Sequence, residues 1–428
     1  MITVSHDPCQ PQSESPEKLR TEPESECRTV TDAFSKCRLP QDEEAILSSS
    51  LYPYYLPVEE RPGQGEVTIG GRRVLMAGSN DYLALSDDPR VKAAAADALL
   101  RLGAGNSGSR ILNGTLALHQ SLEEELAEFF GHEAAMVVTT GYQASLTLAP
   151  LFGPNDVLLA DQHVHASLLD AAHAGQARLR RYRHNDMTHL ARLLETVEPD
   201  QGAIVLTEGM FSVGGDLCDL PGVAKLAAPY GARIVVDTAH DAGLLGPDGR
   251  GAAEHHGLQS AVDVQTITFS KCFGTLGGAV AGPRHVIDFL RHRARAALFS
   301  ASLPASCTAA ARAALDIIRT EPERRQTVLA AAERLRSGLV ALGFAIAPGG
   351  TPTVSFVVGD VVLCCRFWAE LLEEGVLANV MLPPSVPGRK AHLRVSVTAA
   401  HTTAQVDRLL NAIATVAGRV GPIACQIV

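Results

Sequence analysis

The run Thr266-Ile267-Thr268-Phe269-Ser270-Lys271-Cys272-Phe273-Gly274-Thr275-Leu276-Gly277-Gly278 places one lysine between a short apolar segment and several glycines. Residues 264–269 are rich in β-branched side chains, which predicts a buried strand with Lys271 just past its carboxyl end. Open α/β sheets bind ligands at that end. In an enclosed apolar pocket a lysine favours its neutral amine, which can form a Schiff base with an aldehyde. A solvated lysine at a strand end would have the same local sequence. Whether Lys271 is a Schiff-base lysine or a surface lysine therefore depends on the residues found elsewhere in the chain.

A carboxylate ends the strand predicted before this one. The run Ile234-Val235-Val236-Asp237-Thr238-Ala239-His240 puts Asp237 at the tip of a buried segment, where a carboxylate needs a charged or donating partner. The protonated nitrogen of pyridoxal 5′-phosphate (PLP) is such a partner, and the pair makes the cofactor an electron sink. An aspartate that only caps the next helix would also fit this position.

Two further strand ends carry polar groups. The segment Thr139-Thr140-Gly141-Tyr142-Gln143-Ala144 follows a predicted strand and opens a helix, whose first N–H groups can hold a phosphate. The segment His163-Val164-His165-Ala166-Ser167 offers an imidazole that can stack on an aromatic ring. Each signal also fits an ordinary turn or a satisfied histidine, so both roles depend on the remaining pattern.

Strands and helices alternate through the middle of the chain. Near-continuous apolar strands with helical crossovers predict a mainly parallel sheet that is covered on both faces. The predicted strands are residues 135–139, 157–159, 203–207, 233–236, 264–269 and 278–281. From about residue 310, predicted helices at 327–342, 367–374 and 404–416 alternate with strands at 353–358 and 393–397. This indicates a smaller α+β domain.

The N-terminal region has a different composition. Residues 1–43 are rich in Ser, Pro, Glu and Asp, and we expect them to be disordered. Residues 66–69 and 73–76 flank Gly70-Gly71, which predicts a hairpin, and a helix is predicted from Val91 to Leu102. The predicted organisation is therefore a disordered extension (1–43), an N-terminal segment with the hairpin (44–90), a large PLP-binding domain (91–309) and a small C-terminal α+β domain (310–428).

Two other segments carry no chemistry. The glycine-rich residues 103–110 lack a preceding strand and a Walker lysine, so they do not predict a nucleotide loop. Beyond them, Leu118, Leu122, Leu126 and Phe129 repeat at helical spacing, and Glu123, Glu124, Glu125 and Glu128 are predicted on the other faces.

Composition narrows the class of protein. The chain has 428 residues, 46% of them hydrophobic, which is enough for two or three domains with a sizeable core. A net charge of -10 argues against a nucleic-acid surface, and the basic run at residues 291–295 is short. We expect no transmembrane segment, no signal peptide and a cytoplasmic location. The nine cysteines lack C-x-x-C spacing, which predicts reduced thiols and no metal site.

Together these segments resemble the α-oxoamine synthases, which are PLP enzymes of fold type I and include serine palmitoyltransferase, 8-amino-7-oxononanoate synthase, 2-amino-3-ketobutyrate ligase and 5-aminolevulinate synthase. The resemblance covers about residues 54–410. It is carried, in this order, by Ser79-Asn80-Asp81-Tyr82-Leu83, Gly141-Tyr142, His165-Ala166-Ser167, Arg183-His184-Asn185-Asp186, Thr207-Glu208-Gly209-Met210-Phe211-Ser212, Val236-Asp237-Thr238-Ala239-His240, Thr268-Phe269-Ser270-Lys271 and Leu393-Arg394-Val395-Ser396. It implies an α/β fold with a seven-stranded, mainly parallel sheet.

The resemblance also implies roles for single residues. Lys271 holds PLP and moves the Cα proton, Asp237 pairs with the pyridinium, and His165 stacks on the ring. The phosphate contacts are Gly141, Tyr142 and Thr268, with Ser300 and Ser302 reaching the phosphate of the other subunit of a homodimer. Ser212 and His240 are expected to lie near the ring hydroxyl. Substrate binding falls to Arg394, which suits a planar bidentate contact with a carboxylate, and to Asn80 and Ser385.

One position departs from the family pattern. The family usually has Asp or Glu where Thr238 stands, which gives an Asp-Asp-Ala-His or Asp-Glu-Ala-His motif. The pyridinium partner Asp237 is kept, so the expected effect is on the hydrogen bonds around His240.

The resemblance implies a decarboxylating condensation of serine, glycine or alanine with an acyl thioester, delivered by coenzyme A or an acyl carrier protein, to give an α-aminoketone. Tyr52-Pro53-Tyr54-Tyr55, Asn113-Gly114-Thr115 and Pro384-Ser385-Val386-Pro387 resemble serine palmitoyltransferases and favour a long-chain acyl donor. Residues 184–190 resemble the oxononanoate synthases, which use alanine. Another fold-type-I PLP enzyme, such as an aminotransferase, would share Lys271 and Asp237, whereas a noncatalytic subunit is expected to lack the lysine.

Overall fold

The computed structural model describes residues 32–38, 44, 49–63, 65–383, 386 and 390–420. It divides the chain into two units, residues 1–48 and residues 49–428. In the first unit, a turn of 3-10 helix, η1, spans Ser35–Cys37. The extension predicted to be disordered, residues 1–43, lies almost wholly outside the described residues.

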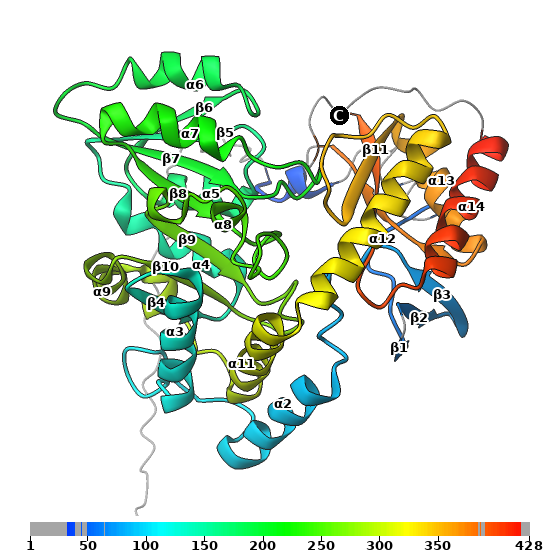
Figure 1. Cartoon of the computed structure of the whole chain (residues 1–428), viewed down its shortest axis with the longest axis horizontal. Coiled ribbons are helices and arrows are strands. Elements are labelled where there is room, and N and C mark those ends of the chain that lie inside the picture. Colours follow the sequence, from blue (N-terminus) through cyan, green and yellow to red (C-terminus); the bar gives the residue numbers. More distant parts are fainter. Residues whose placement is uncertain are drawn as a thin grey trace, which may run out of the picture. The chain divides into compact units, whose positions relative to one another are not determined.

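A seven-stranded sheet forms the centre of the second unit (Figure 1). Its strand order is β4-β10-β9-β8-β7-β5-β6, and the run from β9 to β6 is parallel, while β10 is antiparallel to both of its neighbours. This confirms the predicted fold. The strands are β4 (Ala134–Val138), β5 (Asp156–Asp161), β6 (Arg178–Tyr182), β7 (Gly202–Glu208), β8 (Arg233–Asp237), β9 (Val264–Thr268) and β10 (Gly278–Gly282).

Alternate residues of these strands point to opposite faces of the sheet and build two separate cores. On β5, Leu158 and Ala160 pack with α4, α5 and α9, whereas Val157 and Leu159 pack with α6, α7 and α8. The sheet is therefore covered on both sides, as its apolar strands predicted. The helices around it are α3 (Ala117–Phe130), α4 (Gly141–Thr147), α5 (Ala166–Ala174), α6 (Met187–Leu194), α7 (Leu220–Ala227), α8 (Ala252–His255), α9 (Arg284–Arg293) and α10 (Arg295–Leu298), with short 3-10 turns η2 (Ala149–Leu151), η3 (Ala228–Tyr230) and η4 (Gln259–Ala261).

The strand β6 was not predicted. Arg178, Arg180 and Arg181 interrupt its apolar pattern, and it lies at the edge of the sheet, where it pairs with β5 alone. Charged side chains on an edge strand are common because they discourage pairing with another chain. The prediction missed this segment because apolar periodicity is a weak signal at a half-solvated edge.

Two smaller sheets complete the fold. An antiparallel sheet in the order β11-β14-β13 packs with α13, and α14 packs with α12 and α13. The predicted hairpin is confirmed as β2 and β3. A strand from far along the chain, β12, pairs in parallel with β3. The elements are β1 (Glu60–Gly63), β2 (Glu66–Ile69), β3 (Arg72–Met76), α2 (Pro89–Leu102), α11 (Ala305–Thr320), α12 (Pro322–Ala341), β11 (Thr353–Gly359), α13 (Val361–Glu373), β12 (Val376–Leu377), β13 (Asn379–Met381), β14 (Ala391–Ser396) and α14 (Thr403–Val420).

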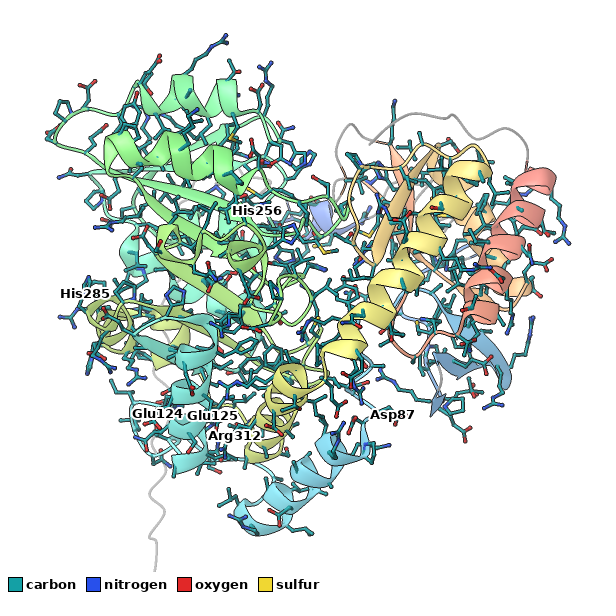
Figure 2. All side chains as sticks on the ribbon, viewed as in Figure 1. Asp87, Glu124, Glu125, His256, His285 and Arg312 are labelled. Atoms are coloured by element: carbon teal, nitrogen blue, oxygen red, sulfur yellow. The ribbon has the colours of Figure 1, made fainter. Side chains whose placement is uncertain are left out.

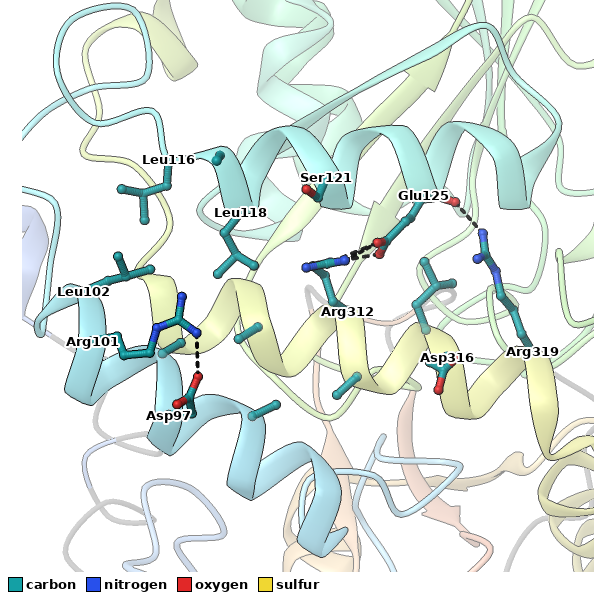
Figure 3. Close-up of a pocket in the computed structure, with 16 residues that line it drawn as sticks. Asp97, Arg101, Leu102, Leu116, Leu118, Ser121, Glu125, Arg312, Asp316 and Arg319 are labelled. Carbon is teal, nitrogen blue, oxygen red and sulfur yellow. Dashed lines mark hydrogen bonds and ion pairs between the residues drawn. The ribbon is translucent and has the colours of Figure 1, made fainter.

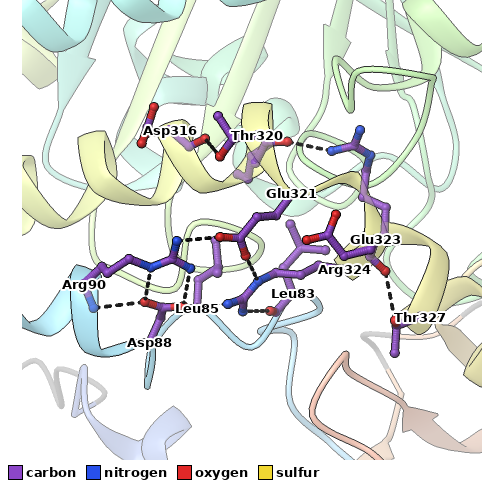
Figure 4. A network of polar contacts seen from close by, with 12 residues as sticks. Leu83, Leu85, Asp88, Arg90, Asp316, Thr320, Glu321, Glu323, Arg324 and Thr327 are labelled. Atoms are coloured by element: carbon purple, nitrogen blue, oxygen red, sulfur yellow. Dashed lines mark hydrogen bonds and ion pairs between the residues drawn. The ribbon is translucent and has the colours of Figure 1, made fainter.

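A network of ion pairs joins the start of α2 to the junction of α11 and α12 (Figure 4). Arg324 contacts Asp88 at 2.6 Å and Glu321 at 2.8 Å, and Arg90 contacts Asp88 at 3.0 Å. The hydrogen bonds from Arg90, together with the charges of Arg90 and Arg324, outweigh the effect of burial and lower the pKa of Asp88 to about 2. The network fixes the segment that continues from Asn80 into α2. Among the described residues, no helix is both long and apolar enough to cross a membrane.

Candidate active site

A cavity of about 310 Å³ opens at the carboxyl ends of β7, β8 and β9. The parallel register brings these strand ends together, because Glu208 lies opposite Asp237 and Asp237 lies opposite Thr266. The cavity is where a parallel sheet is expected to bind its ligand. It is lined by Thr140, Gly141, Tyr142, His165, Ser167, Glu208, Asp237, Ala239, His240, Ile267, Thr268, Ser270 and Lys271. Seven of the predicted site residues are among them.

Lys271 reaches the cavity from a tight loop after β9. Gly274 N–H donates to the carbonyl of Lys271 at 2.9 Å, and Gly274 has a φ of +64°. A β-carbon on Gly274 would lie 2.3 Å from the backbone nitrogen of Ser86, so the loop requires glycine there. Burial lowers the pKa of the Lys271 amine, while Asp237 and Glu208 act in the opposite direction. A larger fraction of the amine is therefore neutral than at a surface lysine.

Two carboxyl groups face this lysine. Asp237 is 6% exposed at the end of β8, and its Oδ1 accepts from Ala239 N–H at 2.9 Å. Glu208 is 2% exposed at the end of β7, and its Oε1 has no hydrogen-bond partner among the described residues. Burial, and then the charge of Asp237, raise the pKa of Glu208 well above its usual value. The role of Glu208 could not be predicted from the sequence, because only the register of β7 and β8 shows that it faces Asp237.

His165 precedes α5 and is anchored by hydroxyl groups. Its Nδ1 lies 2.7 Å from Ser167 Oγ, and Ser167 Oγ donates to Ser145 Oγ at 2.9 Å. Burial lowers the pKa of His165, which favours the neutral imidazole. A neutral ring fixed along one edge is suited to packing against a flat ligand.

A second histidine supports the loop that carries His165. His184 Nδ1 and Nε2 contact Asp161 at 3.0 Å and Asp216 at 2.7 Å, and its ring stacks on His163 with centroids 4.0 Å apart. Burial opposes a charge on His184, but the two carboxylates prevail and raise its pKa to about 9. At neutral pH this imidazolium links β5 to the turn after β7.

A chain of polar contacts leads from the cavity to the small sheet. His240 Nδ1 lies 2.7 Å from the hydroxyl of Tyr82, which lies 2.9 Å from Thr353 Oγ1. Arg394 on β14 donates to Asn80 Oδ1 at 2.6 Å, and its Nε has no partner among the described residues. A buried guanidinium with an unused donor can bind an anionic group. The structure thus places Arg394 beside Asn80, and their role in substrate binding stays a prediction.

The other cavity wall is built from backbone and hydroxyl groups. A β-carbon on Gly141 would lie 2.5 Å from Thr268 Oγ1, so only glycine leaves this backbone open beside the hydroxyl. Thr268 Oγ1 lies 2.9 Å from Ser270 Oγ. With a partly neutral lysine, two carboxyl groups and a fixed imidazole opposite, these residues fit PLP: an amine for its aldehyde, a carboxylate for its ring nitrogen and small polar groups for its phosphate.

Three predicted serines do not line this cavity. Ser302 accepts from Asn106 Nδ2 at 2.8 Å, Ser300 stands two residues earlier on a half-buried segment, and Ser212 lies in the turn after β7. Tyr142, which does line the cavity, is 46% exposed and pairs with Asp170. A fourth serine, Ser385, lies outside the described residues.

A separate cavity of about 700 Å³ lies between α2, α3 and α11 (Figure 3). Four of its charged side chains form two ion pairs: Glu125 accepts from Arg312 Nε at 3.0 Å (Figures 2 and 3), and Asp97 accepts from Arg101 at 3.0 Å (Figure 3). None of the predicted site residues lines it.

The chain is similar to known proteins over most of its length. Residues 73–413 match the family model described as aminotransferase class I and II. The serine palmitoyltransferase of Bacteriovorax stolpii is 37% identical over 89% of this chain and 91% of its own length. The 8-amino-7-oxononanoate synthase of Anaeromyxobacter sp. (strain K) is 43% identical over 83% of this chain and 89% of its own.

A solved serine palmitoyltransferase from S. paucimobilis, with a bound PLP–myriocin aldimine, superimposes on this structure with a TM-score of 0.89. It is 33% identical, and the match covers 91% of this chain and 99% of that one. The predicted fold and PLP dependence are confirmed. The chain belongs to the aminotransferase class I and II family and, within it, to the α-oxoamine synthases, which are PLP-dependent acyltransferases.

Proposed function

We propose that this enzyme condenses a small amino acid with an acyl thioester, with loss of CO₂, to give an α-aminoketone. The observation that carries the proposal is the arrangement of Lys271 and Asp237 in one cavity, with Arg394 and Asn80 linked to it through His240 and Tyr82. PLP, when bound, supplies an electron sink for negative charge at the amino acid's Cα. The remaining steps belong to residues of this chain.

Lys271 and Asp237 carry the proton chemistry. Lys271 holds the cofactor, and its Nζ then takes the Cα proton, a task that suits an amine whose pKa burial has lowered. Asp237 keeps the pyridine nitrogen protonated. His165 would cover the ring, and His240, which lines the same cavity, would lie near the ring hydroxyl. Thr268, together with the backbone of Gly141 and Tyr142, holds the phosphate.

Arg394→Ala is expected to weaken amino-acid binding about ten- to a hundredfold, because the substrate carboxylate loses a charge-assisted contact worth roughly 1.5 to 3 kcal/mol. Steady-state kinetics with both substrates varied should place the effect in the amino-acid KM. Arg408→Ala, which removes an exposed arginine paired with Glu66, is the control and should change nothing. A rise in the thioester KM alone would assign Arg394 to the acyl site.

The acyl donor that we propose is a long-chain thioester, as in serine palmitoyltransferases, because their solved structure superimposes on this one over nearly its whole length. The second candidate is an oxononanoate synthase that uses alanine, and it is favoured by the 43% identical relative. Incubation of holoenzyme with serine, glycine or alanine and a series of CoA and carrier-protein thioesters, with mass detection of the aminoketone, distinguishes the two. Amino-group transfer without release of CO₂ would instead identify an aminotransferase.

We also propose a homodimer with shared active sites in a reducing compartment such as the cytoplasm. Several large apolar side chains are exposed in the single chain, among them Leu100 at 86%, Leu112 at 80% and Phe299 at 78%. Phe299 adjoins Ser300, which lies outside its own chain's cavity. The cysteines among the described residues are free thiols, as expected for a reducing compartment.

Shared sites predict complementation between inactive variants. Two variants should each be inactive alone. Lys271→Ala lacks the amine, and the double variant Ser300→Asp, Ser302→Asp repels the phosphate. An equal mixture of the two variants should recover about a quarter of the wild-type activity, since about half of its dimers are mixed and one of the two sites in each mixed dimer keeps both wild-type elements. Sedimentation shows whether dimers form. A mixture of dimers without recovered activity would place the serines in their own chain's site or in none.

A further inference from the structure

The turn after β8 contains a carboxyl group that the proposed chemistry does not use. Asp241 is fully buried, directly after His240. Its Oδ2 accepts from Ala252 N–H at 2.7 Å, and its Oδ1 has no hydrogen-bond partner among the described residues. A buried carboxyl that is only half satisfied is costly, so its presence calls for a reason.

The carboxyl of Asp241 occupies the space beside a turn that carries a cavity residue. A β-carbon on Gly209 would lie 2.3 and 2.6 Å from its two oxygens, and one on Gly251 would lie 2.7 Å from Oδ2. Gly209 directly follows Glu208, and its N–H donates to the carbonyl of Asp237 at 2.9 Å. Asp241 therefore packs against the link between the two carboxyl groups that face Lys271.

The position usually acidic in this family is not acidic here. Thr238 is fully buried, and its Oγ1 donates to the backbone carbonyl of Thr266 at 2.8 Å. The second carboxyl of this strand end thus stands three residues later, at Asp241. It lies on the turn after β8, next to the same set of charged groups.

The surroundings of Asp241 define its charge. Asp241 interacts electrostatically with four groups: Asp237 on β8, Lys271 and Cys272 in the loop after β9, and Cys218 after β7. On α8, the carboxylate of Glu254 is turned toward Arg250. Burial, opposed by the Ala252 N–H and assisted by Asp237, raises the pKa of Asp241 to about 7.

We infer that Asp241 is a positioning residue of the proposed reaction: its carboxyl holds the turn that carries Glu208 and, when ionised, places a second negative charge behind Lys271 and Asp237. That charge increases the proton affinity of the cofactor nitrogen, which favours removal of the Cα proton. The inference rests on the roles proposed for Lys271 and Asp237.

The test is Asp241→Asn, which keeps the shape and the acceptor for Ala252 N–H but cannot ionise. Exchange of the amino acid's α-proton into heavy water, per mole of holoenzyme, should equal wild type at pH 5.5 and be about three- to tenfold slower at pH 8.5. Exchange requires no acyl thioester, so a wrong acyl donor leaves this test intact. Asp248→Asn, at an exposed carboxylate of the same loop paired with Arg250, is the matched control.

A second measurement, the thermal stability of the cofactor-free protein, distinguishes a positioning role of Asp241 from a purely structural role. The folded pKa of Asp241 lies above its unfolded value, so ionisation costs stability as the pH rises from about 4 to 7. Asp241→Asn should therefore unfold at a higher temperature than wild type at pH 8, but not at pH 4. Slower exchange together with greater stability supports the inference, whereas a parallel loss of both, or an exchange ratio independent of pH, overturns it. If the amide is not accommodated, Asp241→Ser gives the same comparison.

Discussion

Lys271→Ala should reduce turnover by on the order of 10⁴-fold or more, because proton transfer by one positioned group is alone worth about 10²- to 10⁴-fold. The variant also loses the amine that binds the cofactor covalently, so the purified protein should lack the visible absorbance of lysine-bound PLP. The cavity itself should persist, since the loop around Lys271 is held by Gly274 and Ser86 rather than by the amine. PLP added in excess should still bind, but without the visible band.

Lys92→Ala is the matched control for this change. Lys92 is an exposed lysine on α2 that pairs with Asp87 at 2.7 Å, so its removal should affect neither absorbance nor turnover. Activity near the wild-type level in the Lys271 variant would require another residue to carry the proton, and the assignment of this loop would be wrong.

Much of the fold follows from local patterns. Strands such as β5, β7 and β8 are short apolar runs, and their polar ends, Asp161, Glu208 and Asp237, mark where each run reaches the edge of the sheet. Burial on both faces forces this composition, so the sequence predicts these strands reliably. The segments that could not be predicted depend on partners distant in the chain.

Glu123 on α3 illustrates that dependence. It was predicted on a face of the helix away from the core, but it is 4% exposed and contacts Arg110 at 2.8 Å and Arg291 at 2.9 Å. The prediction was wrong because two cations satisfy this carboxylate inside the protein, and one of them, Arg291, is 168 residues away along the chain. No role could be predicted for Glu208 or Asp241 for the same reason, since the groups that they face come together only when the strand ends assemble.

Asp237→Asn should lower kcat about a hundred- to a thousandfold, roughly 2.7 to 4 kcal/mol, while the protein still binds PLP through Lys271. The amide keeps the shape of the carboxylate, and its oxygen can still accept from Ala239 N–H. What it loses is the negative charge that holds the ring nitrogen protonated. Without that charge, the negative charge that develops at Cα is no longer stabilised by a fixed opposite charge.

The measurement that isolates this step is α-proton exchange of the bound amino acid into heavy water, per mole of holoenzyme. Asp263→Asn is the control: Asp263 lies just before β9, at the opposite end of the sheet, and pairs with Arg233 at 2.7 Å. If Asp237 were only a structural carboxylate, its loss would lower stability and cofactor occupancy together, and exchange per holoenzyme would stay within about threefold of wild type. Such a result would remove Asp237 as the pyridinium partner and leave Glu208, directly opposite it on β7, as the remaining carboxyl group that lines the cavity.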